Sequence, residues 1–234
     1  MGYPSRLAEL RRPPARLWLR GPTPPDRAVA VVGTRRADRA GRDLAHRVAK
    51  ELGGAGYAII SGLASGIDCA AHRGAIEGGG ATWAVVGCGA DLASVPTGER
   101  DAGLLRDILA NGGVVAEVPP GTPATSQSLV ARDRIQSGLA LVTVVVQSDL
   151  RSGTMHTARF TIEQGRPLVV FAPAGPGELW SGNASLSDPA GCDPAVLHAR
   201  GGVARAITGR HPVADLVLEP GGFLAPLLDL LSRC

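Results

Sequence analysis

Short apolar runs alternate with helical patterns along residues 28–171, and this alternation strongly limits how the chain can fold. The apolar runs, each an expected strand, are Ala28–Val32, Tyr57–Ile60, Ala81–Val86, Gly113–Ala116, Leu139–Val146 and Pro167–Phe171. The helical patterns between them are Ala37–Leu52, Gly66–Glu77, Glu99–Ala110, Ser126–Ser137 and Gly153–Gln164. Continuous Val/Ile runs with intervening helices are typical of a parallel sheet covered on both faces. The sequence therefore predicts a three-layer α/β fold with a mostly parallel sheet.

The segment before this core, residues 1–27, reads as an N-terminal arm rich in proline and arginine. It carries six arginines against two acidic side chains, so the basic excess of the chain is concentrated there. Prolines interrupt any long helix in this arm. Arg16–Arg20 is expected to form a short edge strand that Trp18 anchors.

The segment after the core, residues 173–234, is predicted to be a C-terminal extension that packs on residues 28–172 or on a dimer partner. It begins with glycine and proline, which favour turns. A short helix is expected at Pro194–Ala199 and a terminal, apolar helix at Phe223–Leu230.

Composition limits the function as well as the fold. The formal net charge is only +3 and aromatic residues make up 3% of the chain, so any nucleic-acid contact must come from a local patch. The four cysteines have no C-x-x-C spacing, and no metal site is expected. The chain shows neither a signal-peptide pattern nor a run long enough to span a membrane. We therefore expect a cytoplasmic protein without membrane contact.

Two loops, each placed between an expected strand and an expected helix, predict anion binding. The first is Ser61-Gly62-Leu63-Ala64-Ser65-Gly66-Ile67-Asp68, in which Ser61, Gly62 and Gly66 keep the backbone accessible. The second contains Ser152, Gly153 and Thr154. The first turn of a helix has unpaired N–H groups and the positive end of the helix dipole, so both loops are expected to face phosphate.

Arginines near these loops are expected to supply positive charge. Gly33 lets the chain turn after the first strand, and Arg35 then stands at the rim. Arg132 and Arg134 are two positions apart and cannot share one helical face, so one is expected at the cleft while the other pairs with Asp133 or Glu117. The G-x-G-x-x-G spacing of dinucleotide sites is absent, so no NAD, FAD or other cofactor is predicted.

Catalytic groups are not arranged in a recognisable pattern. The five histidines form no H-E-x-x-H or similar motif, and His72 is expected to be a packed or solvated side chain and not a base. No catalytic residue is predicted, and a binding function is favoured over an enzymatic one.

Several segments together resemble the DNA-processing protein A (DprA/Smf) family. The resemblance runs from Tyr3-Pro4 to Glu163–Arg166 and includes Leu17–Gly21, Val29–Arg36, Ser61–Asp68, Gly87–Asp91, Glu117–Gly121, Arg132–Leu139 and Ser152–Ala158. It implies an extended Rossmann-like domain that binds single-stranded DNA, forms a homodimer and acts with a RecA-type recombinase in DNA uptake and transformation. It also implies that Gly33, Arg35, Ser61, Gly62, Gly66, Arg132, Arg134, Ser152 and Gly153 line the phosphate-binding cleft.

The chain departs from this family at informative positions. Family members usually read F-P-x-R-N-R where this chain has Leu129–Arg134, which replaces an aromatic by Leu129 and a neutral amide by Asp133. The N-terminal helical module and the C-terminal winged helix are also not found. These departures favour a second hypothesis, a sensor of a nucleotide-derived ligand, with a phosphoribohydrolase-like activity also open although its P-G-G-x-G-T-x-x-E signature is missing. A third is an interaction subunit with a vestigial cleft.

Overall fold

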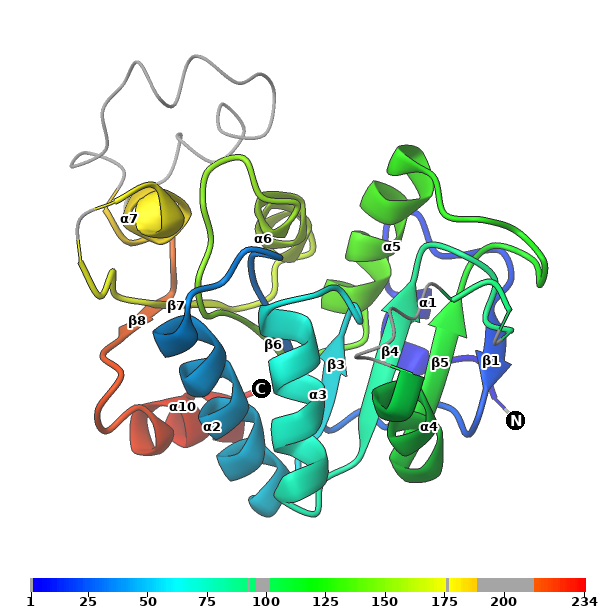
Figure 1. The fold of residues 1–234 in the computed structure, drawn as a ribbon, viewed down its shortest axis with the longest axis horizontal. Coiled ribbons are helices and arrows are strands. Elements are labelled where there is room, and N and C mark those ends of the chain that lie inside the picture. The colour runs from blue at the N-terminus through cyan, green and yellow to red at the C-terminus, as the bar shows by residue number, and fades with distance from the viewer. Residues whose placement is uncertain (1, 92, 96–101, 176, 189–212) are drawn as a thin grey trace.

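One eight-stranded sheet forms the centre of the computed structural model, which describes residues 2–91, 93–95, 102–175, 177–188 and 213–234 (Figure 1). The strands are β1 (Trp18–Arg20), β2 (Ala28–Val32), β3 (Ala58–Ser61), β4 (Thr82–Val86), β5 (Gly112–Ala116), β6 (Val142–Val145), β7 (Leu168–Phe171) and β8 (Leu216–Leu218). Their order is β1-β5-β4-β3-β2-β6-β7-β8. Only β1 is antiparallel to its neighbour, so the sheet is mostly parallel, as predicted.

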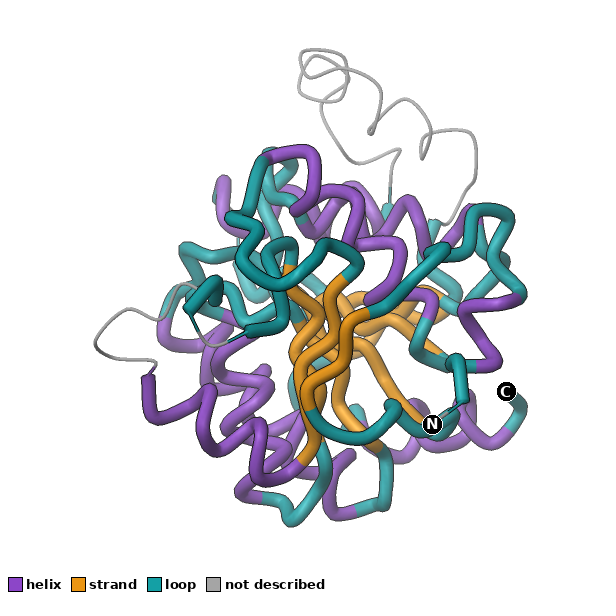
Figure 2. The backbone as a smooth tube through the Cα atoms, turned by 90° about the vertical axis from the view of Figure 1, so that its right-hand side faces the viewer, coloured by secondary structure: helices purple, strands orange, loops and turns teal. Residues whose placement is uncertain are grey.

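Helices cover both faces of this sheet, and Figure 2 shows the strands enclosed between them. The described helices are α1 (Ser5–Ala8), α2 (Arg39–Gly54), α3 (Ile67–Glu77), α4 (Ala102–Asn111), α5 (Ser126–Gly138), α6 (Thr154–Glu163), the 3-10 helix η1 (Glu178–Trp180), α7 (Ser181–Ser187) and α10 (Leu224–Ser232). Alternate residues of one strand enter opposite cores. Val29 packs with α2, α3 and α10, whereas Ala30 packs with α1, α5 and α6. The predicted three-layer α/β fold is confirmed.

The expected strands and helices within residues 28–171 are found close to their predicted bounds, with one instructive difference. The run Leu139–Val146 was expected to be a strand throughout, but α5 continues to Gly138 and β6 begins only at Val142. Leu139 and Ala140 are buried in the connection between them. A short apolar run has the same pattern in a buried turn as in a buried strand, so periodicity does not separate the two.

Both flanking segments contribute an edge strand to the sheet. The expected strand at Arg16–Arg20 is present as β1, which pairs with β5. At the other edge β8 pairs with β7, and Leu227 and Leu231 of α10 are buried against the face that carries α2. The helix expected at Pro194–Ala199 and the start of the one expected at Glu99 lie outside the described residues.

The order of the strands reverses at β2, and this reversal creates a crevice. From β2 the chain builds outward through β3, β4 and β5 on one side, and through β6, β7 and β8 on the other. Gly33 follows β2 at this point, where a Cβ atom would lie 2.4 Å from Cγ1 of Ile67 and 2.7 Å from the carbonyl oxygen of Gln147. In open parallel sheets such a crevice at the carboxyl ends of the strands is the usual place for a ligand.

Candidate anion-binding site

A pocket of about 500 Å³ occupies this crevice. The loops after β2 and β6, the start of α6 and one side of α5 form its walls. It brings together several of the predicted site residues: Gly33, Arg35, Arg132, Ser152, Gly153 and Thr154. Four others, namely Ser61, Gly62, Gly66 and Arg134, do not line it.

Exposed arginines stand at the rim of the pocket. Arg35 and Arg36 are both exposed, and neither forms an ion pair with any residue that the structure describes. Arg151, on the opposite loop, lies 3.6 Å from a carboxylate oxygen of Glu178. Arg35 and Arg36 are therefore the cationic groups at this rim that are available to an incoming anion.

The start of α6 forms the second feature suited to an anion. The Oγ of Ser152 lies 2.8 Å from Oγ1 of Thr154 and accepts a hydrogen bond from the Thr154 amide at 3.3 Å. Gly153 is exposed, and a Cβ atom there would meet nothing within 4 Å. The positive end of the α6 dipole thus lies at this end of the pocket, and Gly153 is the residue there that faces open space.

The Ser61–Asp68 loop does not present its amides in the way that was predicted. The buried Asp68 carboxylate accepts hydrogen bonds from the Gly62 and Ala64 amides, at 3.1 and 3.4 Å. The hydroxyl of Ser61 donates to the carbonyl of Val31 at 2.7 Å. Because a carboxylate of the protein itself occupies these amide donors, this loop forms part of the pocket wall and is not an open cradle for phosphate.

Gly66 also has a packing role. Its φ is +86°, and a Cβ atom would lie 2.5 Å from the carbonyl oxygen of Thr34. The amide of Ile67, next in the chain, donates to that same carbonyl at 3.3 Å. Gly66 therefore lets the start of α3 approach the loop that carries Arg35.

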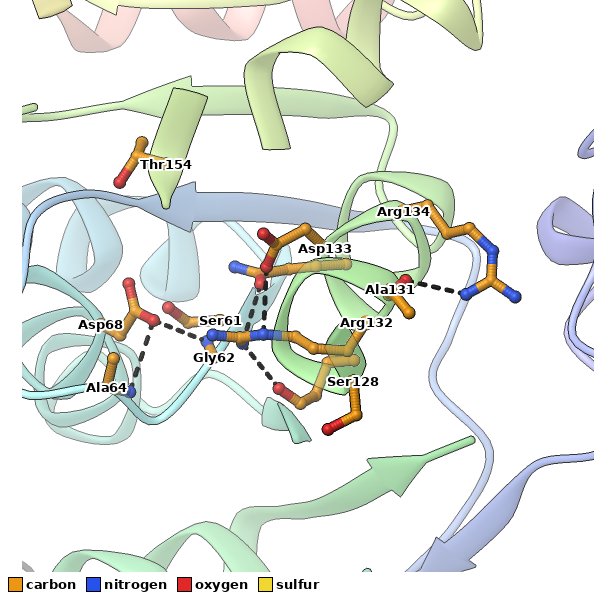
Figure 3. A network of polar contacts seen from close by, with 12 residues as sticks. Ser61, Gly62, Ala64, Asp68, Ser128, Ala131, Arg132, Asp133, Arg134 and Thr154 are labelled. Atoms are coloured by element: carbon orange, nitrogen blue, oxygen red, sulfur yellow. Dashed lines mark hydrogen bonds and ion pairs between the residues drawn. The ribbon is translucent and has the colours of Figure 1, made fainter. Parts of the chain in front are cut away.

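Arg132 is buried, and its guanidinium is engaged in contacts within the protein and is not free to bind phosphate (Figure 3). Its Nη1 donates to the carbonyl of Val85 at 2.7 Å and to Oε1 of Gln136 at 3.0 Å, while its Nε lies 3.0 Å from an Asp133 carboxylate oxygen. A Cβ atom on Gly62 would collide with the guanidinium. Only glycine at position 62 leaves room for this guanidinium. Through its hydrogen bond to Val85, Arg132 joins α5 to the end of β4.

Arg134 lies on the far side of α5 and points away from this cluster (Figure 3). Its Nη2 is 2.5 Å from one carboxylate oxygen of Glu117, and its Nη1 is 2.7 Å from the other. The prediction that Arg134 lines the cleft is wrong. Arg134 is two positions after Arg132 on α5, and side chains two positions apart on a helix do not share a face. Its predicted alternative, pairing with Glu117, is what the structure has.

The buried cluster holds two carboxyl groups around one guanidinium. Burial raises the pKa of Asp133 to about 7, against the lowering effect of Arg132, and the nearby Asp68 raises it further. Burial also raises the pKa of Asp68, although Arg132 and the two amides lower it. The Asp133 carboxyl, on the inner wall of the pocket, therefore changes its charge near neutral pH.

His72 is packed beneath this wall, which is one of the two alternatives that the sequence left open. Its Nδ1 lies 2.7 Å from Oγ1 of Thr82, whose only proton is donated to the carbonyl of Ile59 at 2.9 Å. Nδ1 must then carry the proton, and Nε2 is a buried acceptor without a partner among the described residues. Burial, with the charges of Arg132 and Arg73, lowers the pKa of His72 to about 3, so the ring is neutral.

Asp149 is a site residue that the sequence pattern did not reveal. It is buried, and its carboxylate accepts from Oγ1 of Thr34 at 3.2 Å and from the Arg151 amide at 2.8 Å. It therefore joins the two loops that carry Arg35 and Ser152. Its position just after a buried strand, in Gln147-Ser148-Asp149, was the available signal.

Within the described parts of the chain, no three His, Cys, Asp or Glu side chains are grouped in a way that could hold a metal ion. In the same residues, no helix has both the length and the apolar character needed to cross a membrane.

The fold and this pocket define a Rossmann-like α/β domain with an arginine-bearing crevice at the carboxyl ends of its parallel strands. Residues 1–196 match the model of the family described as DNA recombination-mediator protein A, and the chain belongs to that family. A DNA processing protein DprA from Mycobacterium tuberculosis is 36% identical over 209 residues, which cover 88% of this chain and 51% of the relative. The chain thus spans about half the length of that relative.

Two solved structures show the same fold. DNA processing protein A from Streptococcus pneumoniae matches with a TM-score of 0.72 and 32% identity, over 82% of this chain and 66% of that one. DNA processing protein A from Helicobacter pylori, described for its single-stranded DNA binding mode, matches with a TM-score of 0.77 and 24% identity, over 98% and 94% of the two chains. Family membership confirms the resemblance found in the sequence.

Proposed function

We propose that this protein binds the phosphate backbone of single-stranded DNA in the pocket at the carboxyl ends of β2 and β6. The observation that carries the proposal is the pair Arg35 and Arg36, exposed at the rim without an ion pair among the described residues, opposite the start of α6. A guanidinium without an internal partner is available for a bidentate contact with a phosphate group.

The residues have different roles in this proposal. Arg35 contacts phosphate directly, and Ser152, Gly153 and Thr154 offer hydroxyls and an amide to the same or the next phosphate group. Arg132 is a positioning residue, because its guanidinium is held by Val85 and Asp133. The protein acts by binding and performs no catalytic step.

Family membership supports the wider role. The matching family is named for mediating DNA recombination, and the structure from Helicobacter pylori was described for binding single-stranded DNA. We propose that this chain, in the cytoplasm and as a homodimer, protects single-stranded DNA during uptake and transfers it to a RecA-type recombinase.

A titration of labelled oligo-dT at several salt concentrations tests the binding site. Counterion release makes the logarithm of the binding constant fall linearly with the logarithm of salt concentration, by about 0.7 for each phosphate contact on a single strand. Arg35→Ala is expected to reduce that slope by about 0.7. Arg39→Ala, an exposed arginine on α2 outside the pocket, is the matched control and should leave the slope unchanged.

A panel of mononucleotides in the same assay separates the rival functions. Tight binding of one mononucleotide without measurable oligo-dT binding would contradict the proposal and favour a nucleotide sensor. Release of a free base from a nucleotide would establish an enzyme instead.

A further inference from the structure

A second groove lies at the opposite end of the sheet from the pocket. It has a volume of about 950 Å³ and reaches Leu141 and Pro167, which precede β6 and β7. The arm that follows α1, one side of α5 and the second half of α6 form its walls. In Figure 1, α5 lies between α1 and α6. The groove therefore opens at the amino ends of the strands, whereas the pocket opens at their carboxyl ends.

Arginines dominate the lining of this groove. The six that line it are Arg6, Arg11, Arg12, Arg134, Arg159 and Arg166, and the acidic residues of the lining are Glu9 and Glu163. The near-neutral chain thus concentrates positive charge here, at the junction of its basic N-terminal arm and the α/β core.

Some of these arginines hold the groove together. Arg166 is largely buried, and its Nη2 donates to the carbonyl of Arg6 at 3.0 Å, which fixes the arm against the strand ends. Arg134 is paired with Glu117, and its Nε donates to the carbonyl of Arg12 at 3.3 Å. These contacts give the groove a rigid base.

Two arginines of the N-terminal arm have no counter-charge among the residues that the structure describes. Arg11 and Arg12 are exposed, and their side chains form no ion pair or hydrogen bond with the residues that the structure describes. On α6, Arg159 already has a counter-charge, because its Nε lies 3.5 Å from a carboxylate oxygen of Glu163. The exposed guanidinium groups of Arg11 and Arg12 are therefore the part of the groove wall that is suited to an anionic ligand.

An aromatic surface adjoins these charges. Phe160 lines the groove half-buried, with the guanidinium carbon of Arg159 4.7 Å from its ring centroid. Tyr3 is 44% exposed, and its hydroxyl donates to the carbonyl of Pro14 at 2.8 Å. Tyr3 belongs to the same N-terminal arm as Arg11 and Arg12 but does not line the groove. Aromatic residues are scarce in this chain, so the presence of Phe160 in the lining of a basic groove is informative.

We propose that this groove is a second binding site for single-stranded nucleic acid, separate from the pocket at the carboxyl ends of the strands. Phosphate groups contact Arg11 and Arg12, and a base stacks on Phe160. Arginines alone would also suit an acidic peptide, but the half-buried phenylalanine beneath a guanidinium favours a ligand that carries both phosphate groups and flat bases.

The test compares two double variants of the whole chain in a salt titration with a long oligo-dT. Arg11→Ala with Arg12→Ala removes two proposed phosphate contacts, so the salt slope should fall by about 1.4. Arg20→Ala with Arg39→Ala removes the same charge from exposed positions outside both sites and should leave the slope unchanged. Photo-crosslinking of oligo-dT that contains 4-thiothymidine, followed by peptide mapping, should yield crosslinks at residues 3–12 or at Phe160.

The outcomes also separate the groove from the pocket. If Arg35→Ala lowers the salt slope while the Arg11/Arg12 variant behaves like its control, DNA binds at the pocket and the proposal of a second site in the groove is wrong. If only the Arg11/Arg12 variant lowers the salt slope, the second site in the groove is supported and the proposed binding site in the pocket is contradicted. Crosslinks confined to the pocket would also contradict the proposal of a second site. So would an Arg11/Arg12 variant that lost affinity only for an acidic peptide such as oligoglutamate.

Discussion

At the scale of single residues, the cluster around Arg132 decides how negative the inner wall of the pocket is. One buried guanidinium faces two buried carboxyl groups, from Asp68 and Asp133, so full ionisation gives the buried cluster a net negative charge, which the exposed Arg35 offsets only in part. A buried charge without compensation is costly, and proton uptake relieves it. The raised pKa of Asp133, about 7, follows from this arrangement.

Asp133→Asn is therefore expected to strengthen oligo-dT binding at pH 8 by about 3- to 10-fold, since it removes a negative charge near the phosphate. In the wild type, Asp133 is protonated below pH 7, so affinity should fall as the pH rises from 6 to 8. The variant should show a flatter dependence over this interval. Fluorescence anisotropy at constant ionic strength measures both effects.

The same substitution has a defined effect on stability. A carboxyl group whose pKa is raised in the folded state favours the fold most below its unfolded pKa, and that contribution is lost as the pH rises through about 7. The free energy of unfolding of Asp133→Asn should therefore exceed that of the wild type more at pH 8 than at pH 6. Asp43→Asn, at an exposed position on α2, is the control. Equal behaviour of the two variants would contradict the role assigned to Asp133.

At the scale of elements, glycines at helix starts look alike in the sequence but differ in function. Gly66 and Gly153 each precede a helix after a parallel strand, and the sequence pattern predicts anion contacts for both. In the structure, Gly66 packs against the backbone of Thr34, whereas Gly153 faces open space. The sequence could locate both loops because glycine and serine follow each apolar run. It could not reveal that the Asp68 carboxylate occupies the amides of the first loop, because that contact depends on how the loop folds back on α3.

Gly66→Ala is expected to lower the free energy of unfolding by about 2–4 kcal/mol, because the new Cβ combines a positive φ with a clash against backbone. Gly153→Ala should change it by no more than about 0.5 kcal/mol, since its φ is −56° and no atom lies within 4 Å of the added carbon. Urea denaturation of the two variants measures the difference. Similar losses in both would show that the two loops are equivalent after all.

At the scale of the whole molecule, the sheet was predictable because its strands are continuously apolar and separated by helical patterns of ordinary length. The edge strand β8 was not predicted, since it is only three residues long and is defined by its partner β7, whereas the equally short β1 was predicted from the Trp18 anchor. The basic groove could not be predicted either. Its arginines come from positions 6 to 166, and they are brought together by the packing of both α1 and α6 on α5.

The C-terminal helix α10 tests whether the last residues pack on their own chain or on a second copy. The sequence left open whether its apolar residues pack on the same chain or on a second copy. In the structure, Leu227 and Leu231 are buried against the face of the sheet that carries α2, and the ring of Phe223 lies 5.6 Å from that of Phe171 in β7. Residues of α10 therefore belong to the core of the chain itself.

Leu227→Ala should accordingly lower the free energy of unfolding by about 2–5 kcal/mol, the usual cost of a cavity left by a fully buried leucine. Because the cavity lies within one chain, the loss should be independent of protein concentration, as chemical denaturation at several concentrations can measure. Val217→Ala, at a partly exposed position of the β8 edge strand, should cost far less. A loss that grew on dilution would instead mean that Leu227 is buried between two copies, because mass action makes the stability of an interface depend on concentration.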